Sequence, residues 1–495
     1  MKTKSKSNPE IQTPELLIIG AGPAGLSAAI EAKRCGVERV LIVDRELEAG
    51  GILNQCIHAG FGLFHYGEEL TGPEYAQRLA AEADTAGAAL LTETFVAALD
   101  AKRHATLFSK RFGYVKLRPK AIVLAMGCRE RTRAAVAVPG TRPAGVYSAG
   151  TAQRLINVEG YALGKRAVIV GSGDIGLIMA RRLILEGVEV AGVIEIREMP
   201  AGLPRNVSQC LNAFSVPLFL SHRVVAIEGT SRVTSVVVEP VRGGAAKRIS
   251  CDLVLFSVGL IPENELSTMA GIRTLGRTNG LELSGQMQTE VSGIFACGNA
   301  YRVYDLVDEV SREAALAGRG AAAFLGYRNK ALGQNSDPEP VRSWIPDADQ
   351  RAKSKAAAFS NEDTGDGAFA PTHQPASPFS MTCIICPKGC VITSDHEGNL
   401  SGYGCRRGLE FAIQELRNPS AVLTTTVAIE GTLWPRLPCK TTGSVPRNRL
   451  MEAAVILSGI VVKAPVSMGE VLYRNLLGLG VDVAATRTMK LLEKG

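Results

Sequence analysis

Short, uniformly apolar runs alternate with amphipathic or alanine-rich stretches along the first 330 residues of the chain. The runs LLII and VLIV, within residues 15–46, are apolar at every position, as in strands that are buried on both faces of a parallel sheet. An alanine-rich stretch between them predicts a helix. The same strand, helix and strand order returns at residues 166–196. The pattern predicts an α/β fold with two Rossmann-like dinucleotide-binding domains.

A glycine-rich turn joins the first apolar run to the alanine-rich helix. Gly20 makes the tight turn, Gly22 lets the backbone approach a pyrophosphate, and Gly25 lets helix and strand pack closely. The pyrophosphate is expected at the helix N-terminus, where free N–H groups favour anions. Asp44 ends the second strand, 24 residues after Gly20, and can accept from a ribose hydroxyl. Further predicted contacts of this first site are Pro23, Ala24 and Arg45.

A second copy of the motif predicts a second bound dinucleotide. Its first glycine and the acid that ends its second strand are again 24 residues apart. That acid, Glu195, favours the free 2′-hydroxyl of NAD over NADP. Arg197 weakens the preference, because an arginine can receive a 2′-phosphate. The residues of this predicted NAD site are Gly171, Gly173, Asp174, Ile175, Gly176 and Glu195.

Two further apolar segments, KAIVLAMGCRER and SGIFACGNA, end near glycine. Together with the glycine motifs they resemble the two-dinucleotide-binding flavoprotein family, which holds FAD in the first unit and a nicotinamide in an inserted second unit. The resemblance implies an FAD-binding domain at 14–150 and 285–332, and an NAD(P)-binding domain at 151–284. In this family an acid contacts the ribityl chain of FAD, and Asn299 replaces it here. The FAD contacts that the resemblance implies are Ala125, Gly127, Gly298 and Asn299.

Many members of that family carry a redox disulfide, but the first 330 residues lack the spacing for one. The stretch RELEAGGILNQCIHAGFG contains Cys56 without a second cysteine four or five residues away. Cys56 is a candidate catalytic thiolate with His58 lowering its pKa, or else a packed thiol beside the cofactor. Gly50 and Gly51 in this stretch are expected to let the chain approach the flavin ring. The remaining cysteines here are interpreted as core residues: Cys35, Cys128, Cys210, Cys251 and Cys297.

The composition of the remaining segments predicts a linker and a tail and bears on where the protein acts. Residues 333–378 are rich in Pro, Ser, Asp and Gly and predict a flexible linker, and residues 1–13 predict a disordered tail without the apolar core of a signal peptide. No apolar run reaches the ~18 residues of a membrane span. The net charge of +7 is scattered, so nucleic-acid binding is not favoured. A cytoplasmic location is expected, where clustered cysteines serve metals or catalysis.

Four cysteines within 23 residues open a C-terminal cysteine-cluster domain, which is predicted at 379–495 as a small α+β domain. A CxxCxxxC triplet with a distant fourth cysteine favours a [4Fe–4S] cluster over zinc, which more often uses two CxxC pairs. Zinc and a Cys383–Cys386 redox disulfide remain alternatives, and His396 could replace a cysteine in a zinc site. The predicted ligands are Cys383, Cys386, Cys390 and Cys405.

Longer segments carry a second resemblance. GGILNQCIHAGFGLF, GCRERTR and PGTRPAGVYSAGTAQ resemble the FAD/NAD subunit that accompanies bacterial glycerol-3-phosphate dehydrogenase-like enzymes, and CIICPKGC with GYGCRRG resembles a small domain that occurs beside them. The resemblance implies an NAD(H)-linked flavoprotein that passes electrons between nicotinamide, FAD and the cluster. It also implies a partner flavin dehydrogenase subunit that acts on a small organic substrate. Alternatives are a self-contained NADH oxidase with a structural zinc module, and a redox sensor or scaffold; homo-oligomerisation stays open.

Overall fold

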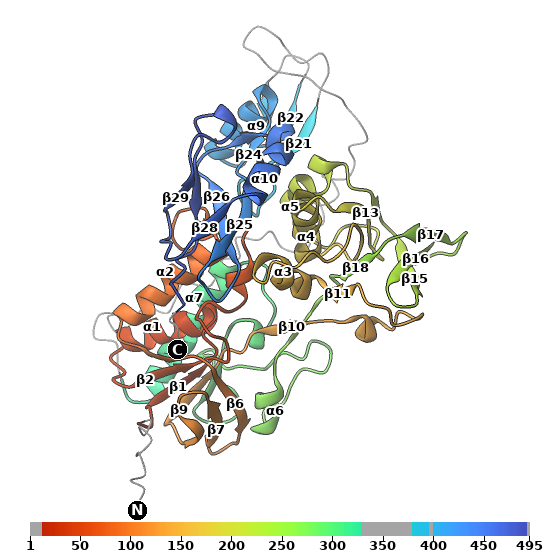
Figure 1. The fold of residues 1–495 in the computed structure, drawn as a ribbon. Coiled ribbons are helices and arrows are strands. Elements are labelled where there is room, and N and C mark those ends of the chain that lie inside the picture. The colour runs from red at the N-terminus through yellow and green to blue at the C-terminus, as the bar shows by residue number, and fades with distance from the viewer. Residues whose placement is uncertain (1–11, 328–378, 396–398, 493–495) are drawn as a thin grey trace, which may run out of the picture. The chain divides into compact units, whose positions relative to one another are not determined.

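The structure, a computed structural model, describes residues 12–327, 379–395 and 399–492. The predicted linker at 333–378 and His396 lie outside the described residues, as does most of the predicted tail. The chain divides into two compact units, Met1–Arg129 with Leu260–Pro338, and Glu130–Gly259 with Glu339–Gly495. The first unit contains the first glycine motif. The second contains the second motif together with the cysteine-cluster domain (Figure 1).

The inserted domain starts and ends earlier in the chain than the sequence suggested. We predicted its limits at 151 and 284, and the structure places them at Glu130 and Gly259. Strand β11 (Val146–Ser148), predicted within the FAD domain, pairs with β18 (Leu253–Phe256) in the sheet of the second unit. Ile272, predicted within the NAD domain, is buried in the core of the first unit. The crossings lie in short segments without strong apolar periodicity, so the pattern could not place them.

A five-stranded parallel sheet forms the centre of the first unit, in the order β20-β9-β1-β2-β5. Leu16 and Ile18 of β1 face the helices, whereas Leu17 and Ile19 face the antiparallel strands β6, β7 and β8. Because both faces are covered, the strands are apolar throughout. The strands are β1 (Leu16–Ile19), β2 (Val40–Val43), β5 (Ala89–Leu91), β6 (Thr94–Leu99), β7 (Ala105–Ser109), β8 (Gly113–Leu117), β9 (Ala121–Leu124) and β20 (Ile294–Ala296).

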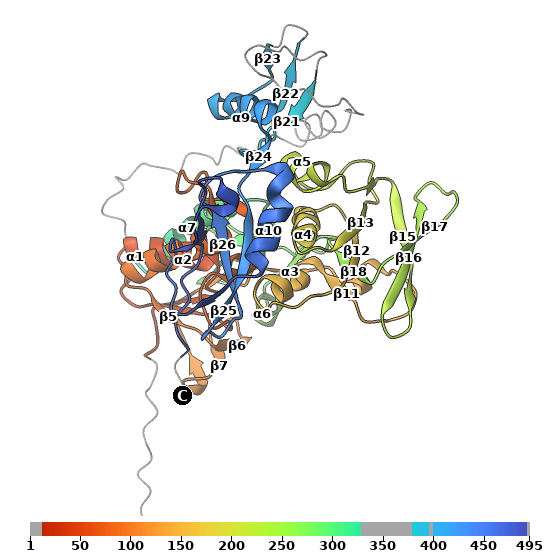
Figure 2. The same cartoon turned by 45° about the horizontal axis from the view of Figure 1, so that its top comes forward.

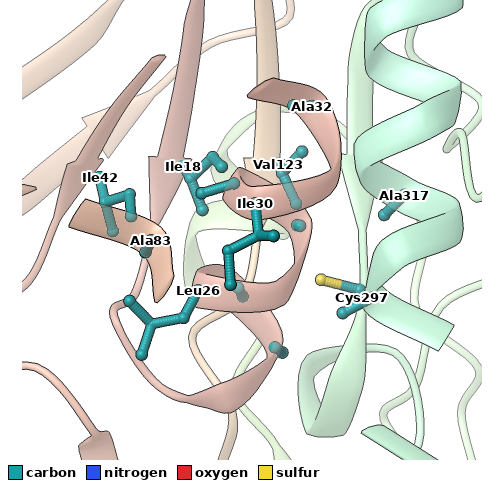
Figure 3. Close-up of a cluster of buried hydrophobic side chains, with 14 of the residues drawn as sticks. Ile18, Leu26, Ile30, Ala32, Ile42, Ala83, Val123, Cys297 and Ala317 are labelled. Atoms are coloured by element: carbon teal, nitrogen blue, oxygen red, sulfur yellow. The ribbon is translucent and has the colours of Figure 1, made fainter. Parts of the chain in front are cut away.

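Small residues allow two helices of the first unit to pack unusually close. A Cβ on Gly318 of α7 (Val307–Phe324) would lie 2.3 Å from the backbone oxygen of Ala28 in α1 (Pro23–Arg34). Figure 3 shows Leu26 and Ile30 of α1, Ile18 of β1 and Ala317 of α7 as members of one buried apolar cluster. The remaining elements of this unit are η1 (Gly51–Gln55), β3 (Ala59–Phe61), β4 (Leu70–Thr71), α2 (Gly72–Thr85), β19 (Leu260–Pro262), α6 (Glu265–Met269) and η4 (Gly298–Ala300).

The second unit repeats this architecture in its first half. Its parallel sheet has the order β11-β18-β12-β13-β14, with helices on one face and antiparallel strands on the other (Figure 2). The elements are η2 (Arg133–Val136), α3 (Ala149–Asn157), β12 (Arg166–Val170), α4 (Asp174–Leu185), β13 (Glu189–Ile194), α5 (Pro204–Cys210), η3 (Asn212–Phe214), β14 (Leu218–Phe219), β15 (His222–Gly229), β16 (Val233–Pro240) and β17 (Lys247–Ser250); β10 (Cys128–Glu130) leads into it.

The C-terminal part of the second unit is an α+β domain, as predicted. A three-stranded antiparallel sheet is followed by α9, and a five-stranded mixed sheet, β28-β25-β26-β30-β29, packs with α10. The elements are β21 (Ser380–Thr382), β22 (Val391–Ser394), β23 (Leu400–Ser401), α9 (Arg406–Arg417), β24 (Ser420–Ala421), β25 (Thr424–Glu430), β26 (Arg436–Thr441), β27 (Val445–Pro446), η5 (Arg447–Arg449), α10 (Leu450–Ser458), β28 (Val461–Lys463), β29 (Val471–Tyr473), η6 (Leu476–Gly478) and β30 (Val483–Ala485).

Helix α4 joins the two parts of the second unit. Arg182 is only 4% exposed and donates to Thr425 Oγ1 at 3.2 Å and to Thr426 Oγ1 at 3.3 Å in β25. The same guanidinium donates to Asn157 Oδ1 at 2.7 Å, which ties α3 into the network. Leu185 of α4 belongs to the hydrophobic core of the C-terminal domain. The C-terminal domain is therefore attached to the dinucleotide-binding half through buried polar and apolar contacts.

Within the described ranges, no helix combines the length and apolar character that crossing a membrane requires.

Candidate cofactor sites and the cysteine cluster

The first glycine turn leaves open space where a pyrophosphate is expected. A Cβ on Gly20 would lie 2.4 Å from the backbone oxygen of Ala125, and one on Gly25 would lie 1.8 Å from that of Gly20. By contrast, no atom of the chain lies within 4 Å of the place that a Gly22 Cβ would take. Gly22 is the N-cap of α1, which has no side-chain cap and no acid in its first turn. The turn therefore presents uncapped helical N–H groups next to the open space at Gly22, as the binding of an anion requires.

Asp44 lies beside this turn, as the sequence predicted. Its Oδ2 accepts from the backbone N–H of Ala21 at 2.6 Å, and its Oδ1 accepts from that of Glu46 at 2.8 Å. Each carboxylate oxygen keeps a second lone pair that can accept from a ribose hydroxyl. Arg45 is exposed, and its place in the FAD site stays a prediction.

The glycine pair after β2 packs against the turn. Gly50 donates its N–H to the backbone oxygen of Ala21 at 2.8 Å, and a Cβ on Gly51 would lie 3.1 Å from the Cα of Gly22. Both glycines have positive φ angles, of 118° and 56°. We expected them to let the chain approach the flavin ring, and the contacts in the structure show a close approach to the pyrophosphate turn.

Asn299 lies in a turn that closes over the N-terminus of α1. Its side-chain oxygen accepts from the N–H of Tyr304 at 3.1 Å, and its amide donates to the sulfur of Cys128 at 3.4 Å. Gly298 has a φ of 61°, and a Cβ there would lie 2.7 Å from that of Ala24. Cys128 is thus half-buried beside Asn299 and does not belong to the core, which corrects our interpretation of this cysteine.

The second glycine turn has the same close backbone contacts as the first, but they are made to Ser257 in place of Ala125. A Cβ on Gly171 would lie 2.2 Å from the backbone oxygen of Ser257, and one on Gly176 would lie 2.7 Å from the Ser257 Cβ. The Ser257 hydroxyl also accepts from the N–H of Gly176 at 3.0 Å. Gly173 has less room than Gly22, since its Cβ would lie 3.2 Å from the Ser257 hydroxyl. Ser257 was not predicted from the sequence.

A repeated signal could have identified Ser257. The segments VLAMG and LFSVG both end an apolar strand, β9 in one unit and β18 in the other, at a glycine with positive φ. Each strand lies next to the first strand of its motif, so Ala125 and Ser257 occupy equivalent places against Gly20 and Gly171.

Glu195 is buried at the end of β13 and holds the second turn together. Its Oε2 accepts from the N–H of Ser172 at 2.9 Å and also from the Ser172 hydroxyl, while Oε1 accepts from the N–H of Arg197 at 2.9 Å. The Oδ1 of Asp174 accepts from the N–H of Leu203 and from the side-chain amide of Asn206, both at 2.7 Å, and the place of Asp174 in the NAD site stays a prediction. Ile175 is half-buried and packs against the core of this domain.

The four clustered cysteines converge from a hairpin and a helix start. Cys383 follows β21 and Cys390 precedes β22, and the N–H of Cys383 donates to the Cys390 oxygen at 2.8 Å. Cys405 is the N-cap of α9, which lies beside this hairpin in Figure 2. Burial raises the pKa of the Cys383 thiol, and the nearby thiols of Cys386, Cys390 and Cys405 raise it further. The four thiols thus lie close enough to one another to interact electrostatically.

The start of α9 lies directly against two of these sulfur atoms. A Cβ on Gly404 would lie 3.0 Å from the sulfur of Cys390, and one on Gly408 would lie 3.7 Å from the sulfur of Cys383. Among the described residues, no three Cys, His, Asp or Glu side chains are yet arranged closely enough to hold a metal ion. The donor set fits a thiolate-bound cluster by type and number, and ligation by these four cysteines stays a prediction.

A short loop links the cysteine hairpin to the second glycine turn. Pro204 contacts the hairpin, since a Cβ on Gly389 would lie 3.2 Å from the Pro204 Cβ. The residues before Pro204 are bound to the glycine turn: Ala201 donates to the Ser172 hydroxyl at 2.8 Å and Leu203 to Asp174. The candidate NAD site and the cysteine hairpin therefore share one support within the second unit.

Residues 14–314 match the family model of the pyridine nucleotide-disulphide oxidoreductases, and residues 406–487 match DUF1667, a family of unknown function. The chain belongs to the pyridine nucleotide-disulphide oxidoreductase family. Among curated proteins it is 25% identical to thioredoxin reductase of Treponema pallidum over 63% of this chain and 97% of that protein. It is 26% identical to one of the subunits of opine oxidase from Agrobacterium tumefaciens, over 64% of this chain and 71% of that protein.

Solved structures confirm the fold of this part. Thioredoxin reductase of T. acidophilum, at 22% identity, superposes with a TM-score of 0.53 over 63% of this chain and 98% of that chain. Thioredoxin reductase of Lactococcus lactis, at 20% identity, superposes with the same TM-score over 63% of this chain and 99% of that chain. As a member of this family, the chain is an FAD-dependent oxidoreductase that uses a pyridine nucleotide.

The family's name includes a disulfide, and the Cys383–Cys386 alternative for a redox disulfide stays a prediction. All eleven cysteines are described and none is disulfide-bonded. Burial raises the pKa of Cys56 to about 12, so this thiol stays protonated at neutral pH. The raised pKa favours the packed thiol beside the cofactor, and the catalytic role of Cys56 stays a prediction. The interpretation of Cys35, Cys210, Cys251 and Cys297 as core residues is confirmed by their burial.

Proposed function

We propose that the chain passes electrons between NAD(H), FAD and a [4Fe–4S] cluster that is held by the four converging cysteines. The observation that carries this proposal is the approach of the Cys383 and Cys390 sulfurs to the start of α9, which Cys405 caps, in the same compact unit as the second dinucleotide turn. FAD supplies an acceptor for a nicotinamide hydride and can pass electrons on singly. The chain's own residues position the two dinucleotides through the glycine turns and their acids, Asp44 and Glu195.

The surroundings of the four thiols favour a negatively charged cluster. Helix α9 has no acid in its first turn and begins with Arg406 and Arg407, so its N-terminus attracts negative charge. The ammonium of Lys388 and the sulfur of Cys390 both lie 3.0 Å from the place that a Gly404 Cβ would take. These cations offset the net negative charge that four thiolates leave on either metal site, and most of all the further charge that an iron–sulfur cluster gains on reduction, because zinc has no redox chemistry.

The chain is also proposed to act as one component of a larger enzyme. It is similar over most of its first part to a protein whose name makes it one of the subunits of an oxidase. Outside the flavin pocket the sequence offers no candidate base for an organic substrate, which fits a chain that handles electrons. We propose that a partner flavin dehydrogenase, of the glycerol-3-phosphate type that the sequence resembles, supplies that chemistry. NAD is proposed over NADP because Glu195 ends β13.

Electron paramagnetic resonance on anaerobically purified protein, before and after NADH is added, tests the proposal. A reduced-cluster signal that develops with NADH, together with about four iron atoms per chain, is expected. Cys405→Ser should lose the signal and most of the iron, while Cys439→Ala, which alters a buried core cysteine outside the cluster, should keep both. Zinc in place of iron, with flavin still reduced by NADH, would support the self-contained oxidase instead.

A further inference from the structure

A buried carboxylate lies behind the first glycine turn, on helix α7. Glu313 is only 9% exposed, and its Oε1 accepts from the backbone N–H of Gly298 at 3.3 Å. Its Oε2 lies 3.6 Å from Nη2 of Arg302, whose side chain is 60% exposed. Solvent therefore screens much of this ion pair. Glu313 is held mainly by one backbone N–H in a largely apolar environment.

The backbone N–H that donates to Glu313 belongs to Gly298, in the turn at the predicted FAD site. Gly298 lies against Ala24, near the start of the helix whose N-terminus faces the expected pyrophosphate. Asn299, the residue that replaces the ribityl-binding acid, follows immediately and is anchored by Tyr304. Glu313 thus connects the interior of α7 to the cofactor-facing turn.

The environment leaves Glu313 between its two protonation states near neutral pH. Burial raises the pKa of its carboxyl to about 7, although Arg302 and the Gly298 N–H act in the opposite direction. On the preceding strand end, the Cys297 thiol is buried and its pKa is raised, so it is neutral. On α7 itself, Asp308 accepts from the N–H of His65, and Arg319 pairs with Glu31 of α1. The charged group that acts on Glu313 is thus Arg302.

We propose that Glu313 is a positioning residue that takes up a proton from solvent when the bound flavin is reduced. Hydride transfer from the reduced nicotinamide moves two electrons and one proton to FAD and leaves the oxidised nicotinamide. It adds one negative charge to the flavin, because the hydride carries that charge. The added charge favours the neutral form of a nearby carboxylate, which then gains one proton from water. Only FAD and the pyridine nucleotide take part, so this role of Glu313 holds with or without a metal cluster at the cysteines.

The test is the pH dependence of the midpoint potential of bound FAD, followed by its visible absorbance from about pH 5.5 to about pH 8.5. Above about pH 7, Glu313 is ionised in the oxidised protein, so reduction should take up one additional proton for two electrons. In the wild-type protein the midpoint potential of FAD should therefore fall more steeply with pH above about pH 7 than below it. Glu313→Gln keeps an oxygen for the Gly298 N–H and should lack this steeper slope. Equal slopes for the two proteins would overturn the proposal.

A matched variant and a second readout keep the test decisive. Glu31→Gln removes another largely buried acid between α1 and α7 and should keep the wild-type slope. If Glu313→Gln does not fold or bind FAD, infrared difference spectroscopy of the wild type replaces it. Reduction at about pH 8 should then produce the carbonyl band of one newly protonated carboxylic acid. A spectrum without that band would also overturn the proposal.

Discussion

At the scale of single residues, the glycines of the two dinucleotide turns differ in what they make possible. Gly25 and Gly171 allow backbone segments to touch, because a Cβ at either position would overlap a backbone oxygen. No atom of the chain lies within 4 Å of the place that a Gly22 Cβ would take, and the φ of Gly22 is −73°, which any residue can adopt. Its lack of a side chain therefore matters to the ligand and not to the fold.

This difference predicts opposite effects for two alanine variants. Gly22→Ala should change the free energy of unfolding of the protein without FAD by no more than about 0.5 kcal/mol, yet prevent stable FAD binding. Gly25→Ala should destabilise the first unit by about 3 kcal/mol or more, because its Cβ would lie 1.8 Å from the Gly20 oxygen. Denaturant unfolding and the flavin content of the purified protein separate the two effects. Normal FAD content in Gly22→Ala would contradict this assignment.

At the scale of elements, α4 both begins at the second glycine turn and contacts the C-terminal domain. Its N-terminus belongs to the second glycine turn, and its C-terminal half carries Arg181, Arg182 and Leu185 toward the C-terminal domain. Burial lowers the pKa of Arg182, and Glu186, at 2.6 Å, opposes that effect. A buried, paired cation stabilises a structure only while all its partners are present.

Replacing Arg182 should therefore weaken the whole second unit. Arg182→Met leaves the Asn157 oxygen without its 2.7 Å donor and removes the ion pair with Glu186, and should destabilise the unit by about 3 kcal/mol. Arg248→Met is the matched control, because Arg248 forms a surface ion pair with Glu228 in the same unit and is 68% exposed. It should leave the denaturation midpoint close to that of the wild type. Denaturation midpoints measure both, and equal midpoints for wild type and Arg182→Met would contradict the prediction.

At the scale of the molecule, the C-terminal domain covers apolar surface of the inserted dinucleotide-binding domain. Leu185 is 6% exposed and Phe214 packs against the same core, which otherwise consists of residues after 420. Arg154 of α3 also lies over the ring of Trp434, at 5.3 Å from its centroid. The inserted domain alone would present these side chains to water.

A chain that ends at residue 378 should consequently be less stable and more prone to association than the full chain. The uncovered Leu185 and Phe214 form an apolar patch beside Arg182, which loses its hydrogen bonds to Thr425 and Thr426. Size-exclusion chromatography should therefore show oligomers, and thermal unfolding should occur at a lower temperature. The same truncation with Leu185→Ser should be more monodisperse. A monodisperse truncated chain with the thermal stability of the full protein would show that the two parts are independent.

Much of the first 327 residues could be predicted because its signals are local. Buried parallel strands are apolar at every position, and each glycine motif with its terminal acid spans one strand–helix–strand unit. The predicted places of Gly20, Gly25, Gly171 and Gly176 are confirmed by the backbone contacts that their missing side chains allow. The composition of the cysteine triplet likewise identified a separate domain before any contact was known.

The tertiary structure alone decided what depends on contacts between distant segments. It placed Ser257 under the second turn, brought Cys128 to Asn299, raised the pKa of the Cys56 thiol, and set the domain limits at Glu130 and Gly259. It also attached the cysteine-cluster domain to α4. Apart from Ser257, which the repeated strand-to-glycine segment could have indicated, these features have no period or spacing in the sequence, because each depends on which surfaces meet after the chain has folded.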